Sequence, residues 1–211
     1  MLASLAAVLL LASSPVTAPA PPPEARALAR RVQGYYERTR DLEARFRQTY
    51  TYAGFGRRQV STGTLKVKKP GMMRWDYQTP AQKVVAVTGH RLVQYEPEEQ
   101  QAYVDEQFDA SAMSAAVTFL LGKGDLAREF SLGVDATGAL LLKPREADPR
   151  VESVALTVGA EGAVEVTRVV DGGGNVNEIR FEDVKRNAGI PDGAFEVKLP
   201  KDVRRISAPT R

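Results

Sequence analysis

Residues 63–77 constrain the fold more than any other stretch, because two segments with a period of two flank a Pro-Gly turn. In the first segment, Leu65 and Val67 fall on one face of an extended chain, while Lys66 and Lys68 fall on the other. The second segment, residues 72–78, is again rich in bulky apolar side chains. The stretch therefore predicts a β-hairpin with one apolar face.

The preceding segment, residues 42–52, has the same period. Leu42, Ala44, Phe46, Gln48 and Tyr50 fall on one face, and charged or polar residues occupy the positions between them. Further short apolar runs follow at hairpin spacing, separated by Gly or Pro turns, and include residues 126–134 and a last extended piece at 195–199. We count about eleven strands.

Two segments break this pattern with a helical period. Residues 24–38 repeat apolar side chains among arginines and glutamates, which is typical of an amphipathic helix. Residues 109–121 have almost no polar face, so this helix needs cover on nearly all sides. Its apolar residues include Met113, Ala116, Val117, Phe119 and Leu120.

A meander of about eleven strands must curl, because a twisted sheet of that size does not stay flat and open. We therefore expect a mainly β fold, an incomplete antiparallel β-barrel covered by two or three helices. A half-closed barrel of this size encloses space that either a helix or a ligand must fill. An apolar helix inserted midway through the meander is a natural cover for the barrel mouth, although it is equally compatible with an ordinary packed core.

The composition excludes several classes of protein. The net charge of +3 is small and evenly spread, which argues against nucleic-acid binding. Residues 1–20 have the apolar character of a signal peptide, which leaves 21–211 as a single exported domain. The chain has no cysteine and therefore no site for lipid anchoring by acylation, so we expect a protein that is soluble after export.

Candidate catalytic and metal-binding residues are lacking in the sequence. Zinc or iron sites need clustered Cys, His or carboxylates, yet the chain has no Cys and a single histidine, His90, in a predicted turn. Residues 172–174 are three glycines between two strands and are not followed by a phosphate-binding helix. We therefore expect no enzyme activity and no cofactor.

Apolar strand residues remain as candidates for a binding site. Taken singly, each is compatible with an ordinary core; together they could line a cavity. The residues that we assign to the cavity wall are Leu42, Phe46, Leu65, Val67, Trp75, Val85, Leu92 and Tyr95.

In order and spacing, these segments resemble the LolA family of periplasmic outer-membrane lipoprotein carriers over essentially the whole mature length. The matching segments are the Leu-x-Ala-x-Phe-x-Gln strand at 42–48, the Gly-x-Leu-x-Val-Lys-Lys-Pro arm at 63–70, and the Arg-Trp-Asp-Tyr strand at 74–77 closed by Pro80. The hairpins at 84–89 and 92–97 and the apolar helix that ends at 121–122 continue the match.

The resemblance implies an incomplete barrel whose helices form a lid over a hydrophobic cavity. It implies a soluble periplasmic monomer that binds acyl chains of lipoproteins released by an inner-membrane ABC exporter and passes them to an outer-membrane receptor. The same half barrel also suits a sensor or a carrier of other lipids, which stays open as an alternative.

One position departs from the family pattern. Many members have an arginine directly before the proline of the strand-closing turn, where it hydrogen-bonds carbonyl groups of the lid, and this chain has Lys69. A lysine offers three donors on a flexible stem in place of a planar fork. The resemblance thus suggests Lys69 as a looser latch between wall and lid, and leaves Lys66 and Lys68 in solvent.

Overall fold

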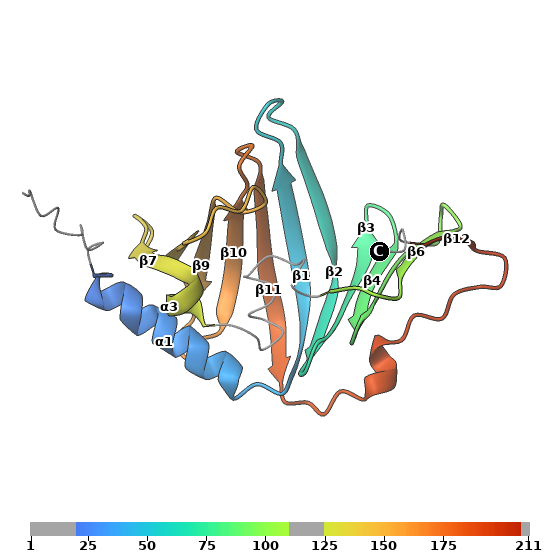
Figure 1. Cartoon of the computed structure of the whole chain (residues 1–211), viewed down its shortest axis with the longest axis horizontal. Helices are drawn as coiled ribbons and strands as arrows, with labels where there is room; N and C mark the ends of the chain where they lie inside the picture. Colours follow the sequence, from blue (N-terminus) through green and yellow to red (C-terminus); the bar gives the residue numbers. More distant parts are fainter. Residues whose placement is uncertain (1–19, 110–124, 208–211) are drawn as a thin grey trace, which may run out of the picture.

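The alternating segments form one open sheet in the computed structural model, which describes residues 20–109 and 125–207 (Figure 1). The sheet has twelve strands in the order β12-β6-β5-β4-β3-β2-β1-β11-β10-β9-β8-β7, and its end strands, β12 and β7, do not pair with each other. The predicted fold class is therefore confirmed, with twelve strands in place of about eleven.

Eleven of the strands form antiparallel pairs, and β12 pairs in parallel with β6. The first half of the chain contains β1 (Asp41–Thr51), β2 (Arg58–Lys68), β3 (Met72–Thr79), β4 (Lys83–Thr88), β5 (Arg91–Glu96) and β6 (Gln101–Asp105). The second half contains β7 (Phe130–Val134), β8 (Leu140–Pro144), β9 (Ser153–Val158), β10 (Val164–Val170), β11 (Val176–Arg186) and β12 (Arg204–Ser207).

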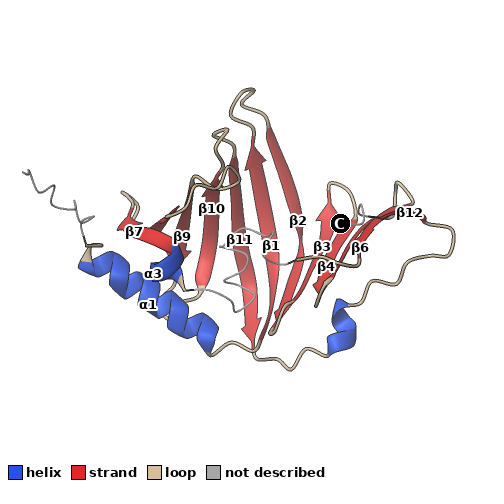
Figure 2. Ribbon diagram, viewed as in Figure 1, coloured by secondary structure: helices blue, strands red, loops and turns tan. Residues whose placement is uncertain are grey.

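Helix α1 (Pro23–Glu37) confirms the helix predicted at 24–38 and lies across one face of the sheet, which we call the inner face (Figure 2). Proline at the first helical turn suits this start, because its missing N–H has no partner there in any helix. The apolar stripe of α1 is buried against β7 and β8. The stripe consists of Ala25, Leu28, Ala29, Val32, Tyr35 and Tyr36.

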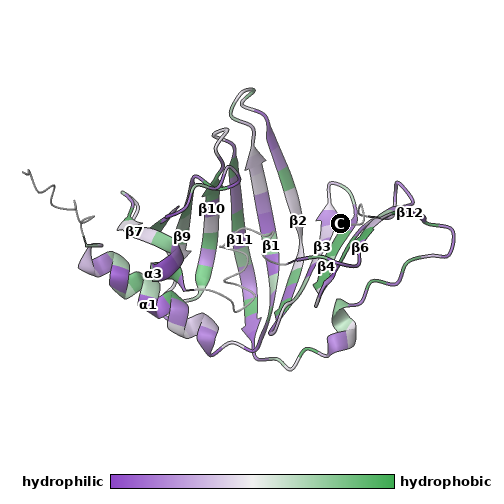
Figure 3. Cartoon of the chain, in the orientation of Figure 1, coloured by the Kyte–Doolittle hydropathy of each residue, from purple (hydrophilic) through white to green (hydrophobic). Residues whose placement is uncertain are grey.

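The largest cluster of buried residues lies between α1 and β7–β9. Phe130, Leu140, Leu142 and Val154 are each no more than 1% exposed. Figure 3 shows the alternation behind this packing, with hydrophobic residues interspersed with polar ones along the strands. One strand face thus supplies the core while the other remains polar.

Two of the predicted strands were wrong. Residues 126–134 do not form a single strand, because α3 (Leu126–Glu129) precedes β7 and is capped by Asp125, whose carboxylate accepts hydrogen bonds from the backbone N–H groups of Ala127 and Arg128. Residues 195–199 are not a strand either. They follow the short 3₁₀ helix η2 (Asp192–Phe195), and the last strand is β12.

The segment after β11 covers the opposite, outer face of the sheet. Arg74 holds it by donating hydrogen bonds to the carbonyls of Ala194 and Glu196, while its guanidinium also pairs with Asp76 at 2.8 Å. Lys68 donates to the carbonyl of Ile190 and pairs with Asp192 at 2.5 Å, so our expectation that Lys68 lies free in solvent was wrong.

The predicted leader, residues 1–20, and the predicted apolar helix, residues 109–121, lie outside the described residues except for Ala20 and Asp109. The five lid residues Met113, Ala116, Val117, Phe119 and Leu120 fall in this undescribed stretch. Within residues 20–109 and 125–207, no helix combines the length and the apolar character needed to cross a membrane.

Candidate functional site: an apolar cavity on the inner face

A row of apolar side chains crosses five strands on the inner face. Strand register places Leu42 opposite Val67, Val67 opposite Met73, Met73 opposite Val87, and Val87 opposite Leu92. Because directly opposed residues in a sheet share a face, these side chains form one continuous wall. Leu65 and Phe46 extend the wall within β2 and β1 and are each 2% exposed.

Next to this row lies a group of four aromatic rings. Phe46 meets Trp75 edge to face at 4.7 Å and Tyr77 at 5.1 Å between ring centroids. Phe181 of β11 lies 6.5 Å from Trp75. Trp75, Tyr77 and Phe181 are only partly buried, so this part of the inner face keeps apolar surface that is not fully packed.

Gly63 makes room for the aromatic group. A Cβ atom at this position would lie 2.9 Å from the ring of Phe46 and 2.0 Å from the carbonyl oxygen of Asp76. Both contacts are shorter than van der Waals distances, so a side chain there would force Phe46 and β3 apart. In the sequence, Gly63 was only the first residue of the alternating arm at 63–70, and its packing role appears only in the structure.

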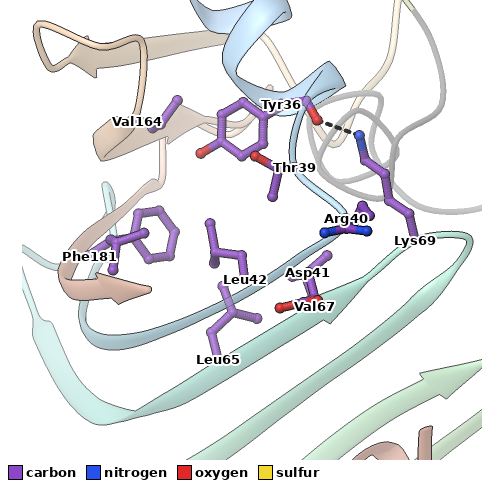
Figure 4. Close-up of a pocket in the computed structure, with 11 residues that line it drawn as sticks. Tyr36, Thr39, Arg40, Asp41, Leu42, Leu65, Val67, Lys69, Val164 and Phe181 are labelled. Atoms are coloured by element: carbon purple, nitrogen blue, oxygen red, sulfur yellow. Dashed lines mark hydrogen bonds between the residues drawn. The ribbon is translucent and has the colours of Figure 1, made fainter. Parts of the chain in front are cut away.

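A mostly apolar pocket opens where the wall meets the end of α1 (Figure 4). The pocket is narrow, with a cavity volume of about 20 Å³. The residues that line it are Tyr36, Thr39, Arg40, Asp41, Leu42, Leu65, Val67, Lys69, Val164, Phe181 and Val184. Strands from both halves of the sheet therefore meet the helix at this pocket.

Lys69 connects the wall to the helix. Its Nζ donates a hydrogen bond of 2.5 Å to the carbonyl oxygen of Tyr36, in the last turn of α1 (Figure 4). The final carbonyls of a helix lack partners within the helix, and a cation there also meets the negative end of the helix dipole. Partial burial lowers the pKa of Lys69, and the nearby carboxylate of Glu37 opposes that shift.

Tyr36 at the pocket and Tyr77 in the adjoining aromatic group remain neutral at physiological pH. Burial raises the pKa of Tyr36 well above its usual value of 10.0, while a hydrogen bond with the backbone of Val164 acts in the opposite direction. Burial also raises the pKa of Tyr77. These phenols therefore add apolar rings to the cavity without adding charge.

The structure brings together most of the predicted wall residues. Leu42, Leu65 and Val67 line the pocket, and Phe46, Trp75 and Leu92 belong to the adjoining cluster. Val85 lies opposite Trp75 in β4, so it shares their face.

Tyr95 does not belong to this wall. It is opposite Val84 in the sheet and packs with Val93, Ala102 and Val203 on the outer face. Leu92 and Tyr95 are three positions apart in one strand, so alternation itself places them on opposite faces. The prediction for Tyr95 was wrong for this reason.

Sequence reasoning missed seven of the residues that line the pocket, namely Tyr36, Thr39, Arg40, Asp41, Val164, Phe181 and Val184. Tyr36 lies in the last turn of α1, whereas Val164, Phe181 and Val184 belong to β10 and β11, far from β1 in the sequence. Phe181 reaches the wall because it is opposite Phe46 in the pairing of β11 with β1. A single sequence carries no signal for that pairing, since the two strands are separated by more than a hundred residues.

Comparison with known proteins agrees with this architecture. The sequence model of the outer membrane lipoprotein carrier protein LolA matches residues 37–198. An outer-membrane lipoprotein carrier protein of Alkalilimnicola ehrlichii is 30% identical over 175 residues, which cover 82% of this chain and 81% of the relative. Its counterpart in Dechloromonas aromatica is 29% identical over 176 residues, covering 79% of this chain and 81% of the relative.

Among solved structures, an uncharacterized conserved protein from Thermus thermophilus shares the fold. Its TM-score is 0.53 at 10% identity, and the match covers 87% of this chain and 99% of that chain. The resemblance noted in the sequence is thus confirmed, and the chain belongs to the LolA family of outer membrane lipoprotein carrier proteins.

Proposed function

We propose that this protein is a periplasmic carrier that holds the acyl chains of lipoproteins in the inner-face cavity. The observation that carries the proposal is the apolar pocket between α1 and the wall, which continues into a partly exposed aromatic group. A triacylated protein exposes dozens of CH₂ groups, each worth about 0.8 kcal/mol on transfer out of water. Such cargo needs an apolar shelter while it crosses an aqueous compartment.

The names of the relatives support the cargo assignment, because both are called outer-membrane lipoprotein carrier proteins. In this role the cargo comes from an ABC exporter in the inner membrane and leaves for a receptor in the outer membrane. The affinity must then be moderate, since the carrier itself has to give up its cargo without chemistry of its own. Lys69 would serve as the latch, since a single flexible donor joins the wall to α1.

A release assay tests the carrier role. Inner membranes that contain the exporter and a radiolabelled acylated lipoprotein are incubated with ATP and the purified protein. We expect a soluble one-to-one complex, and no complex with a lipoprotein whose acylated cysteine has been replaced. If the lipoprotein stays in the membrane while free phospholipid co-purifies, the protein is a general lipid binder and the carrier proposal is wrong.

A matched pair of variants locates the binding surface. Leu92→Gln places an amide on the partly buried edge of the cavity wall, while Val60→Gln places the same group at a position that is 37% exposed. We expect about a tenfold loss of complex for Leu92→Gln, because an unpaired amide costs about 1 kcal/mol or more against apolar cargo. Equal yields for both variants would contradict binding at this wall.

A further inference from the structure

The turn between β1 and β2 projects beyond the neighbouring turns of the sheet (Figure 1). At its apex Phe55 is 90% exposed, far more than the other exposed large hydrophobic residues, Ile206 at 40% and Val60 at 37%, among the described positions. Glycines stand on both sides of it, at 54 and 56, so no neighbouring side chain shields the ring. Single exposed hydrophobic residues are common on protein surfaces, so the surroundings of Phe55 decide what its exposure means.

Hydrogen bonds hold this tip in a defined conformation. The backbone N–H of Tyr52 donates to the carbonyl of Arg57 at 2.9 Å, and the N–H of Gly56 donates back to the carbonyl of Tyr52 at 3.0 Å. The N–H of Ala53 donates to the side-chain oxygen of Asn175 in the β10–β11 turn at 3.1 Å. The phenylalanine is therefore presented by two linked hairpins.

Basic residues outnumber acidic ones around the tip, where Asp171 of the linked β10–β11 turn lies beside Tyr50. Arg57 and Arg58 follow Phe55 directly after Gly56, and the segment 49–60 contains no Asp or Glu. Arg58 lines a hollow on the outer face together with Arg168, Thr49 and Thr51, and Glu178 is the acidic residue in that hollow. Below the apex, the rings of Tyr50 and Tyr52 meet at 4.7 Å.

An apolar apex, tyrosines behind it and arginines beside it reproduce the order of environments at a bilayer surface. Aromatic rings favour the interface between acyl chains and headgroups, and arginines pair with phosphates. We propose that the β1–β2 tip docks transiently on a membrane that contains anionic phospholipid. Phe55 enters the interfacial layer, while Arg57, Arg58 and Arg168 contact the headgroups.

A single aromatic anchor with a few cations gives weak, reversible attachment, because stable anchoring needs larger apolar area. Weak contact would slow the carrier near a membrane without trapping it there. The proposal goes beyond the carrier role and does not depend on it, since empty lipid vesicles are sufficient to test it.

Vesicle co-sedimentation provides the test. Vesicles of phosphatidylglycerol and phosphatidylcholine in equal parts should bind the protein at low salt, and pure phosphatidylcholine should bind it less. Phe55→Ser should weaken binding about tenfold, as expected from the loss of one buried aromatic side chain. Its unfolding midpoint should stay unchanged, because the ring is exposed.

The charge contribution has a matched control. Arg57→Gln with Arg58→Gln should weaken binding to the anionic vesicles by about tenfold or more at low salt, and the difference should shrink as salt is added. Lys198→Gln with Lys201→Gln makes the same change in net charge at positions away from the tip. This control should bind like the wild type; equal losses in both pairs would mean a general charge effect and would overturn the proposal.

Depth of insertion gives a second readout. The emission of a Phe55→Trp variant should be quenched by vesicles with brominated acyl chains, whereas that of the wild type, which has only Trp75, should change little. Absence of wild-type binding to anionic vesicles would refute the proposal. So would a Phe55→Ser variant that loses affinity only for membranes containing the exporter, because the occupant would then be a protein.

Discussion

The inner face of the sheet is covered differently in two regions, which we call the α1 end (β7–β9) and the aromatic end (β1–β5). Over β7–β9, α1 completes the packing, and side chains such as Phe130 and Leu140 are no more than 1% exposed. Over β1–β5 the wall carries the same alternation of apolar residues, yet Trp75, Tyr77 and Leu92 are only partly buried. Alternation thus defines an apolar face, and the partner on that face determines whether it becomes a core or a cavity.

Under the proposed function, one end serves stability and the other serves binding. The α1 end resembles the interior of an ordinary globular domain, where each lost methylene weakens the fold. At the aromatic end some apolar surface stays exposed, which lowers stability, as expected of a binding site. Substitutions at the two ends should therefore affect different measurements.

The largest effect is expected at the α1 end. Phe130→Ala should lower the free energy of unfolding by about 3–5 kcal/mol, because it removes a fully packed ring and leaves a cavity. Urea denaturation followed by circular dichroism measures this loss. A cost below about 1 kcal/mol would show that this end is not tightly packed and would break the distinction between the two ends.

Trp75→Ala should affect cargo binding more than stability. We expect a smaller loss of unfolding free energy, about 2 kcal/mol, since the ring is only partly buried. We also expect a clear fall in the yield of soluble lipoprotein complex in the release assay. Unimpaired complex formation by folded Trp75→Ala protein would argue against the aromatic group as part of the cargo site.

The dependence of stability on alkaline pH tests the burial of Tyr36, which lies where α1 meets the cavity wall. Since the folded-state pKa of Tyr36 is raised, its contribution to stability is complete below pH 10 and is lost as the pH rises further. At pH 11 the loss should be about 1 kcal/mol relative to pH 8. Tyr36→Phe should remove this loss, measured as the urea midpoint, and leave the part that comes from Tyr77, whose pKa is also raised; an unchanged dependence would assign all of it to other groups.

The Lys69 contact should have the smallest effect on stability. Lys69→Leu removes a hydrogen bond to the carbonyl of Tyr36, which is worth about 1 kcal/mol or less. The proposed latch role predicts a larger change in the rate of cargo loss to membranes, which Lys69→Arg should correct. Lys66→Leu on the same strand serves as the control, and equal rates for all three variants would rule out a latch.

Local periodicity was sufficient to predict much of the fold. The predicted helix at 24–38 and the observed α1 differ by one residue at each end, and residues 42–52 form a strand with the expected buried face. The alternation of apolar residues predicted a strand wrongly where the chain is held by side-chain hydrogen bonds and not by backbone pairing with another strand. Residues 195–199 alternate like a strand, but Arg74 binds the carbonyls on either side of Phe195.

The candidate site was predictable on the side that local strands build. Leu42, Leu65 and Val67 were assigned to the wall from alternation alone, and they line the pocket. The opposite side consists of Tyr36, Val164 and Phe181, which arrive through long-range pairing and helix docking. Those contacts depend on which strands become neighbours, and no local pattern encodes that choice.

The parallel pairing of β12 with β6 has a consequence for behaviour at high concentration. Without Arg204–Ser207, the backbone N–H and C=O groups along the edge of β6 would face solvent and could template the addition of another chain. Covering that edge leaves a terminal strand of only four residues, which carries two adjacent arginines. Protection against edge-to-edge polymerisation is thus built into the same segment that packs the outer face.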